Sequence, residues 1–396
     1  MKVSVREQDS LWRYSQLFQV PLPLIIDSNP GIDPDRLMIG QTIDIPGYII
    51  SEYTIAPGDT LWLLSVRHQI PLDAIMLLNP SVDADSLMIG RTIRLPVRVT
   101  WPIVQGERPY PYAVLMEELN QLHEIYPFMR MNTIGSSVMG KPIPELQIGR
   151  GDKRVHMNGS FHANEWITTA VIMRFVNDYL LALTNRQAIR GLVMEPYYSS
   201  AMLSIVPMVN PDGVDLVING PPPEEPYRSQ VLQINGGQTD FTGWKANIRG
   251  VDLNDQFPAN WELEAERREQ TPSPRDYPGR FPLSEPEAQA MAELTRVRDY
   301  DRVLAFHTQG REIYWGYEGY EPPESETIVN EFARVSGYRA VRYVDSHAGY
   351  KDWFIQDWRR PGFTIELGEG VNPLPIEQFE EIYQESLGIF LASLYM

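Results

Sequence analysis

The first hundred residues of this chain contain two copies of one short unit. Shifting the sequence by 50 positions aligns residues 3–46 with residues 53–96 and gives 19 identical pairs in 44 positions without a gap. The longest shared run is Leu37–Gly40, which matches Leu87–Gly90. Self-similarity at one fixed spacing indicates that this part of the chain folds as two equivalent small modules.

The two copies share a predicted β-α-α-β order of elements. In the second copy, a β-branched run at Tyr53–Ile55 leads, through a turn with a helix N-cap, to an amphipathic helix over Leu61–His68. A second helix is predicted over Leu72–Leu78, because an Asn-Pro pair follows it. A closing strand is predicted over Thr92–Leu95, and we expect it to end at Pro96.

Composition narrows the chemistry that the chain can perform. The sequence has no cysteine, which excludes disulfides, cysteine-ligated zinc and a thiol nucleophile. Its 34 basic and 52 acidic residues give a formal net charge of −18, which argues against nucleic-acid binding because phosphate contacts need clustered Lys and Arg. Hydrophobic residues make up 43% of the 396 positions, so the chain is not of the disordered class. Only six histidines are available to a catalytic site.

The N-terminal residues do not resemble a targeting signal. Charged side chains occur from Lys2 to Arg13, with no apolar core of the kind that secretory signals have. We also find no uncharged apolar run that approaches the ~20 residues of a membrane-spanning helix. We therefore expect a cytoplasmic protein without a transmembrane segment, which leaves the cell only by a non-classical route or by lysis.

Several short motifs in the repeat resemble the LysM module. The second copy contains Gly58–Trp62, Asn79-Pro80 and Leu87–Gly90 at the spacing of that family, while the first copy has Glu7–Ser10 in place of the usual Pro-Gly-Asp-Thr turn. The resemblance implies binding to N-acetylglucosamine-containing glycan such as peptidoglycan. We expect modules at residues 1–47 and 48–97. The alternative is a small α/β repeat without a ligand.

The remainder of the chain has the pattern of one α/β domain. A linker is expected at residues 98–108 and a catalytic domain at 109–396. The predicted strands are Leu146–Gly149, Arg154–Gly159, Met202–Val209, Val303–His307 and Phe363–Leu367; the predicted helices are Thr168–Leu183, Glu285–Thr295 and Ile376–Tyr395. Strands that alternate with helices of this length predict a mixed, mostly parallel sheet flanked by helices, with its site at strand ends.

A His-x-x-Glu pair stands where a predicted strand meets a predicted helix. His162 and Glu165 follow the strand that ends at Gly159, and imidazole and carboxylate are both ligands that suit Zn²⁺. A catalytic zinc uses three protein ligands, and His307 at the end of another apolar strand is the candidate for the third. Such a pair alone is common on helix surfaces, so the prediction depends on the whole set.

Glu366 places a carboxylate inside the apolar run Phe363–Leu367. Burial of a carboxylate is costly unless it has a partner or a chemical role. The alternative interpretation is an edge-strand glutamate that faces water.

From Pro109 to Met396 the motifs occur in the order typical of the zinc carboxypeptidase family, the M14 metallopeptidases, which this domain resembles. The matching segments are Phe161–Thr168, Asn210–Gly213, Gly250–Asn254, His307 and Thr364–Leu367. The resemblance implies that His162, Glu165 and His307 bind one zinc ion. It implies that Glu366 is the general base and then the general acid. It also implies that Arg249 stabilises the oxyanion.

The resemblance implies four substrate-binding positions, of which one departs from the family. Arg249 and Asn254 match it, and Tyr343 is the first choice for its substrate-binding tyrosine, with Tyr350 as the alternative. Asp255 stands where the family has the arginine that holds a C-terminal carboxylate. An anion repels that carboxylate and favours an amino group, unless the position is idle.

LysM-like modules and Asp255 together suggest one substrate. Peptidoglycan stem peptides contain γ-D-glutamyl-meso-diaminopimelic acid, whose side chain ends in an ammonium and a carboxylate. The sequence therefore predicts a zinc endopeptidase that hydrolyses this γ-D-glutamyl bond. The resemblance further implies an enzyme of sporulating bacteria that reaches the cell wall or spore cortex. Two alternatives stay open, namely a carboxypeptidase that trims stem-peptide C-termini and a catalytically inactive peptidoglycan-binding protein. No Gly-x-Ser-x-Gly motif supports an α/β-hydrolase.

Overall fold

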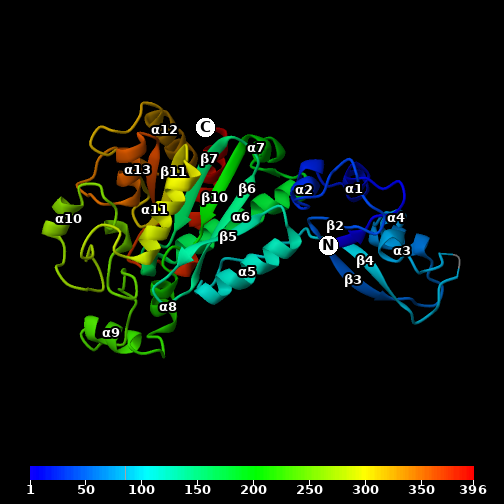
Figure 1. Ribbon diagram of the computed structural model, residues 1–396, viewed down its shortest axis with the longest axis horizontal. Coiled ribbons are helices and arrows are strands. Elements are labelled where there is room, and N and C mark those ends of the chain that lie inside the picture. Colours follow the sequence, from blue (N-terminus) through cyan, green and yellow to red (C-terminus); the bar gives the residue numbers. More distant parts are fainter. Residues whose placement is uncertain (85) are drawn as a thin grey trace. The chain divides into compact units, whose positions relative to one another are not determined.

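The computed structural model describes residues 1–84 and 86–396, and it divides into two compact units (Figure 1). Unit 1 comprises residues 1–103, 118–130 and 177–196, and unit 2 comprises residues 104–117, 131–176 and 197–396. The domain boundaries expected at residues 47, 97 and 108 stay a prediction.

The N-terminal part of unit 1 contains two β-α-α-β modules, as predicted. The first consists of β1 (Lys2–Ser4), α1 (Leu11–Phe18), α2 (Leu22–Asp27) and β2 (Thr42–Asp44); the second consists of β3 (Tyr48–Thr54), α3 (Leu61–His68), α4 (Leu72–Leu78) and β4 (Thr92–Arg98). Strands pair antiparallel within each module. Ser10 and Thr60 are the N-caps of α1 and α3, because each side chain accepts a backbone hydrogen bond, at 3.1 and 3.0 Å.

The repeated asparagines explain why the Asn-Pro pair recurs. The Asn79 side-chain amide donates to the carbonyl oxygens of Ile75 and Arg94, both at 2.7 Å, and its Oδ1 accepts from Arg94 N at 2.9 Å. It thereby joins the end of α4 to β4. The strand itself is longer than predicted, since β4 continues through Pro96 to Arg98. A two-stranded sheet leaves one edge of each strand unpaired, so a residue without an N–H group is tolerated there.

Unit 2 is built on a mixed, mostly parallel sheet, which confirms the predicted fold class. Its strand order is β13-β12-β14-β11-β7-β10-β6-β5. The strands are β5 (Arg130–Ser136), β6 (Pro142–Gly149), β7 (Lys153–Gly159), β10 (Ala201–Val206), β11 (Arg302–Thr308), β12 (Glu312–Tyr314), β13 (Arg339–Val341) and β14 (Gly362–Leu367). The central strands β10, β7, β11 and β14 run parallel to one another.

Helices cover both faces of this sheet. The helices and 3₁₀ turns of this part of the chain include α5 (Tyr112–Ile125), η1 (Ala163–Glu165), α6 (Ile167–Asn185), α8 (Pro211–Asn219), α9 (Tyr227–Ile234), η2 (Leu253–Asp255), α10 (Trp261–Arg267), α11 (Pro286–Arg298), α12 (Glu324–Ser336), α13 (Tyr350–Trp358) and α14 (Phe379–Tyr395). Neighbouring residues of β11 show the two layers. Phe306 stacks on Phe390 of α14 at 4.8 Å, whereas Ala305 belongs to the core formed with α11 and α13. Successive side chains of a strand point to opposite faces.

The segment Ala163–Asn185 is long and apolar enough to cross a membrane by length and composition, although it contains Glu165, Arg174 and Asp178 and so is not an uncharged run. However, 83% of its most apolar stretch is buried inside the protein. This is the pattern of a core helix, so we assign no membrane span to it.

Parallel pairing of β7, β11 and β14 places the carboxyl ends of these strands at one edge of the sheet. His162 follows β7, and His307 and Glu366 are paired residues of β11 and β14. The candidate residues of three distant segments therefore meet at this edge.

Candidate active site

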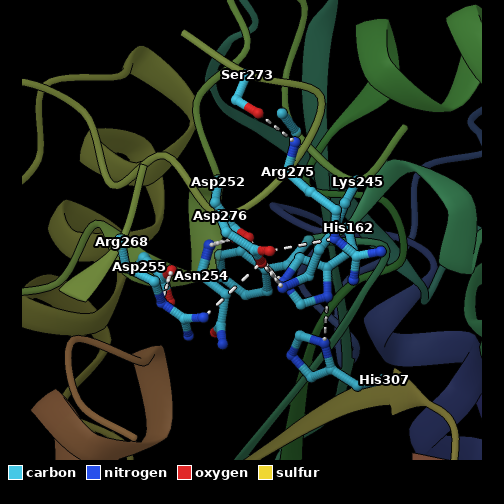
Figure 2. A network of polar contacts seen from close by, with 12 residues as sticks. His162, Lys245, Asp252, Asn254, Asp255, Arg268, Ser273, Arg275, Asp276 and His307 are labelled. Carbon is cyan, nitrogen blue, oxygen red and sulfur yellow. Dashed lines mark hydrogen bonds and ion pairs between the residues drawn. The ribbon is translucent and has the colours of Figure 1, made fainter. Parts of the chain in front are cut away.

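His162, Glu165 and His307 converge in the interior of unit 2. The single turn of η1 folds Glu165 back onto His162, whose Nδ1 lies 2.8 Å from Glu165 Oε1. His307 Nδ1 lies 3.0 Å from Glu165 Oε2. It also lies 3.1 Å from His162 Nδ1 (Figure 2). All three side chains are buried.

This donor set fits a metal ion. Its three ligand atoms lie within 4.8 Å of one another. With zinc–nitrogen bonds of about 2.0–2.1 Å, two ligands of a tetrahedral site are roughly 3.3 Å apart, close to the spacing of the two Nδ1 atoms. Burial lowers the pKa of His162, but the carboxylates of Glu165 and Asp252 outweigh burial and raise it to about 9. The surroundings therefore favour a positive charge at this point.

Two residues that sequence analysis did not identify form a chain of contacts that begins at His162. Asp252 Oδ1 lies 3.2 Å from His162 Nε2, and Lys245 Nζ lies 2.9 Å from Asp252 Oδ2 (Figure 2). Burial lowers the pKa of Lys245, but Asp252 and Asp255 hold it above its ordinary value. Asp252 lies inside the Gly250–Asn254 motif, which was a usable signal, whereas nothing in the sequence distinguishes Lys245.

Glu165 is also fixed by groups outside the histidine pair. Thr308 N donates to its Oε2 at 3.3 Å, and Asn372 Nδ2 donates to its Oε1 at 3.4 Å. Donors on both oxygens hold the carboxylate in one orientation. Asn372 was not identified from the sequence.

Glu366 lies beside this group on β14, in register with His307 on β11. Its side chain is half-buried, so it is not the freely exposed edge residue of the alternative interpretation. Burial and the charge of Glu165 raise the pKa of Glu366 above its ordinary value. The carboxylate of Glu366 is therefore placed close to a ligand that binds at His162 and His307.

Arg249 does not join this group. Its side chain is 49% exposed and pairs with Glu285 at 3.4 Å. In the described part of the chain, the cation in contact with Asp252 is Lys245.

The two candidate tyrosines occupy different environments. Tyr343 is 52% exposed, and its hydroxyl donates to Glu321 at 2.9 Å. Tyr350 is fully buried, with its hydroxyl 2.8 Å from that of Thr295. Only Tyr343 is placed where a substrate can reach it without opening the core.

Asn254 and Asp255 belong to η2, directly after Asp252. Asp255 is buried and lies 3.2 Å from Arg268, a cation that sequence analysis did not identify (Figure 2). Burial and the charge of Asp252 raise the pKa of Asp255 above its ordinary value.

Fold and site together define a zinc metallopeptidase, and the chain belongs to the zinc carboxypeptidase family. The model of that family matches residues 115–388, and the LysM domain model matches residues 3–46 and 53–96. The chain is 63% identical, over all 396 residues of both proteins, to gamma-D-glutamyl-L-diamino acid endopeptidase 1 of Lysinibacillus sphaericus. It is 46% identical over 296 residues to the protein YqgT of Bacillus subtilis, covering 74% of this chain and 79% of that one.

Solved structures show the same fold at low identity. Bovine thrombin-activatable fibrinolysis inhibitor, in complex with tick carboxypeptidase inhibitor, superposes with a TM-score of 0.58 at 20% identity. The match covers 73% of this chain and 97% of that one.

Proposed function

We propose that this zinc metallopeptidase hydrolyses the γ-D-glutamyl–meso-diaminopimelate bond of peptidoglycan stem peptides, with its LysM modules bound to the glycan. The observation that carries the proposal is the buried carboxylate of Asp255. It lies three residues beyond the Asp252 that contacts His162, where a carboxypeptidase needs a cation for the C-terminal carboxylate. The name of the relative that is 63% identical over the full length supports the same bond and substrate class.

His162, Glu165 and His307 are proposed to hold the metal. Zinc supplies Lewis-acid chemistry, because it polarises the scissile carbonyl group and makes a water molecule more acidic. Asp252 fixes the outer nitrogen of His162, and Thr308 and Asn372 fix Glu165, so the donor atoms are held in place before substrate binds.

Glu366 is proposed to carry the proton transfer. Its carboxylate accepts a proton from the attacking water and then delivers it to the nitrogen atom of the leaving diamino acid. Pairing of β14 with β11 sets it beside His307, so the base stands next to the metal ligands. Lys245 or Arg249 is the cation that stabilises the developing oxyanion, and substitution of each by Gln distinguishes the two.

Asn254, Asp255 and Tyr343 are proposed to bind the leaving residue. Asp255 offers its carboxylate to an ammonium group, while Asn254 and the exposed Tyr343 supply neutral hydrogen-bonding groups. A free peptide C-terminus gains nothing from Asp255, which is why we favour the endopeptidase over the carboxypeptidase.

The glycan is proposed to bind the exposed apolar side chains of the modules. Trp12 and Trp62 occupy equivalent positions and are 63% and 62% exposed. The Met-Ile pairs of the repeated run Leu37–Gly40 and Leu87–Gly90 are exposed as well. Aromatic faces of this kind suit neutral sugars. Two modules on one polymer raise the apparent affinity through effective concentration.

We further propose that the enzyme acts on the cell wall during sporulation and resides in the cytoplasm of the sporulating cell. The LysM modules support association with the wall. Fractionation of the source cells through sporulation, with an antibody against the chain, tests this placement. Signal confined to growing cells or to the medium contradicts it.

The function is tested by digesting disaccharide-tetrapeptide muropeptides with the zinc-loaded full chain and weighing the products. The proposal expects a disaccharide that retains L-Ala-D-Glu, together with released diaminopimelyl-D-alanine. A carboxypeptidase instead releases the terminal D-alanine alone. An inactive wall-binding protein leaves the substrate intact while still sedimenting with insoluble peptidoglycan.

A further inference from the structure

Arg268 lies among buried carboxylates close to the active site. Its Nε is 3.2 Å from Asp255 Oδ2 and 2.7 Å from Glu264 Oε1, and its Nη1 is 3.9 Å from Asp276 Oδ1. The carboxylates of Asp255 and Glu264 are buried, whereas the Arg268 side chain is 28% exposed. Arg268 is therefore partly open to solvent or to a ligand, as is Asp276, whose side chain is 31% exposed.

Within the described residues, Nε of Arg268 is buried between the carboxylates of Asp255 and Glu264, and the contacts are ion pairs without hydrogen-bond geometry. Asp255 Oδ2 and Glu264 Oε1 are likewise buried without a hydrogen bond. Buried polar atoms in native proteins almost always have a partner. Nε cannot bond both carboxylates with its one hydrogen atom, and Nη1 is 3.9 Å from its carboxylate neighbour, so Asp255 and the outer edge of the guanidinium retain capacity for a group that binds beside them.

Arg267, the preceding residue, has the contacts of an arginine with a purely structural role. Arg267 donates from Nε to Glu264 Oε2 at 3.0 Å, and from Nη1 and Nη2 to Asp345 at 2.8 and 3.0 Å. Its guanidinium is hydrogen-bonded on every nitrogen. Arg267 and Arg268 both contact the carboxylate of Glu264. Their different hydrogen bonding therefore comes from the directions of the two side chains and not from the local sequence.

The position of the pair relates it to the metal ligands. Asp255 is the last residue of η2, and the residue that precedes η2, Asp252, contacts His162. Figure 2 shows Asp255 and Arg268 on one side of Asp252, with His162 and His307 on the other. Asp255 and the aspartate that contacts His162 are therefore separated by only two residues of one short turn.

On the basis of the proposed function, we propose that Asp255 and Arg268 form one binding site for an amino-acid head group on the leaving residue, with its ammonium on Asp255 and its carboxylate on Arg268. A guanidinium donates two parallel hydrogen bonds to a carboxylate. An ammonium satisfies the open oxygen of Asp255. The free end of a diaminopimelate side chain carries both groups on one carbon atom.

This arrangement makes a prediction that Asp255 alone does not make. A substrate with only the ammonium leaves Arg268 unsatisfied, and one with only the carboxylate leaves Asp255 unsatisfied. Sites built to hydrogen-bond a substrate group discriminate strongly against analogues that lack it. If Arg268 merely neutralised Asp255, its loss would affect all substrates alike.

The test uses the zinc-loaded full chain and four γ-D-glutamyl peptides. Their leaving residues are meso-diaminopimelate with both groups, lysine with only the ammonium, 2-aminopimelate with only the carboxylate, and norleucine with neither. Arg268→Gln is expected to lower kcat/KM about ten- to a hundredfold for the two substrates that carry the carboxylate, and to leave the other two within about threefold. Asp255→Asn is expected to affect the two that carry the ammonium.

Arg267→Gln is the matched control, since it removes the same charge beside the same glutamate and should change all four substrates alike. Arg268→Lys should recover part of the loss with diaminopimelate. An equal loss on all four substrates in Arg268→Gln, or no loss, overturns the inference. Failure of the proposed function has a different signature, because the wild-type chain then leaves the γ-D-glutamyl bond of all four peptides intact.

Discussion

The Nε2 atom of His162 lies 3.2 Å from Oδ1 of Asp252, while Nδ1 of the same ring faces His307. A carboxylate on the outer nitrogen fixes the tautomer and orientation of a metal-binding imidazole. We expect Asp252→Asn to weaken zinc affinity about 10- to 100-fold, as measured by competition with a chelator.

Asp276→Asn is the control for that substitution. Asp276 also faces Lys245, at 3.6 Å, but contacts no histidine in the described structure. If Asp252→Asn retains zinc as tightly as Asp276→Asn does, the carboxylate has no part in holding the metal site.

Replacing Glu366 by Gln separates chemistry from metal binding. The amide keeps the size of the side chain but cannot accept the proton of water, so turnover should fall by about 10²–10⁴-fold. Zinc content should stay at one per chain, because Glu366 is not among the three clustered ligands. His307→Ala is the contrasting variant and should lose zinc and activity together. Substantial turnover by Glu366→Gln would remove this residue from the mechanism.

Lys245 and Arg249 compete for the role of the oxyanion-stabilising cation. Lys245 contacts Asp252, whereas Arg249 points to Glu285. We expect Lys245→Gln to reduce kcat by about 10²–10³-fold and Arg249→Gln by no more than a few-fold. Lys245→Arg keeps the charge and checks that Asp252 is still compensated. A larger loss in Arg249→Gln would restore the assignment made from sequence.

The sequence alone predicted those parts of the structure in which a repeated pattern determines the direction of a strand or of its side chains. The shift of 50 residues fixed both modules, and apolar strands that end in His or precede His-x-x-Glu placed His162 and His307 at one sheet edge. The alternation of side chains along a strand determines which face of the sheet a residue occupies. Parallel pairing brings the carboxyl ends of neighbouring strands to the same edge. The fold class and the three clustered metal-binding candidates follow from these two rules.

The remaining residues depend on side-chain directions outside regular strands. Lys245 and Arg268 lie in a loop and at a helix end, and charged residues are so common there that no spacing distinguishes them. Arg249 matched the family motif, and Tyr350 was the alternative to Tyr343. In the structure Arg249 pairs with Glu285, and Tyr350 is buried in the core. Tertiary packing determines where these side chains lie, and no periodic pattern in the sequence encodes it.

The two modules are joined where their sequences differ. Arg6 binds Asp73 with both terminal nitrogens, at 2.7 and 3.1 Å, and Arg13 adds a contact at 3.1 Å. The repeat places Ala56 and Leu63 at the positions equivalent to the two arginines. The ion pairs with Asp73 therefore join the two modules, while both arginines also pair with Asp9 inside the first module, at 3.2 and 3.5 Å.

Asp73→Asn should loosen that pairing at a small cost in stability, about 1 kcal/mol, because the pairs are partly exposed. Affinity for insoluble peptidoglycan should fall several-fold, while affinity for a short N-acetylglucosamine oligomer that fills one module should not change. Sedimentation and calorimetry measure the two. Glu52→Gln removes the same charge from an exposed strand position and should alter neither. Equal losses on both ligands would mean that the modules act independently.

Glu287, which is not one of the metal ligands, should make the free energy of unfolding depend on pH. Its carboxyl group is buried in α11 and accepts a hydrogen bond from Val138 N at 3.0 Å. Burial, together with the charges of Asp212 and Glu285, raises the pKa of Glu287 to about 7.

Between pH 4.5 and about 7 the unfolded chain releases this proton while the folded chain keeps it. The unfolded state then binds fewer protons, so the free energy of unfolding falls as pH rises through this window, by a contribution on the order of 3 kcal/mol. Glu287→Gln should remove that part of the slope, and it should raise the stability at pH 8 relative to pH 5. Denaturant unfolding of the zinc-loaded protein at both pH values measures it. Glu293→Gln, on the exposed side of the same helix, should leave the slope as it is. A Glu287→Gln variant with the wild-type slope would mean that the buried carboxyl titrates normally.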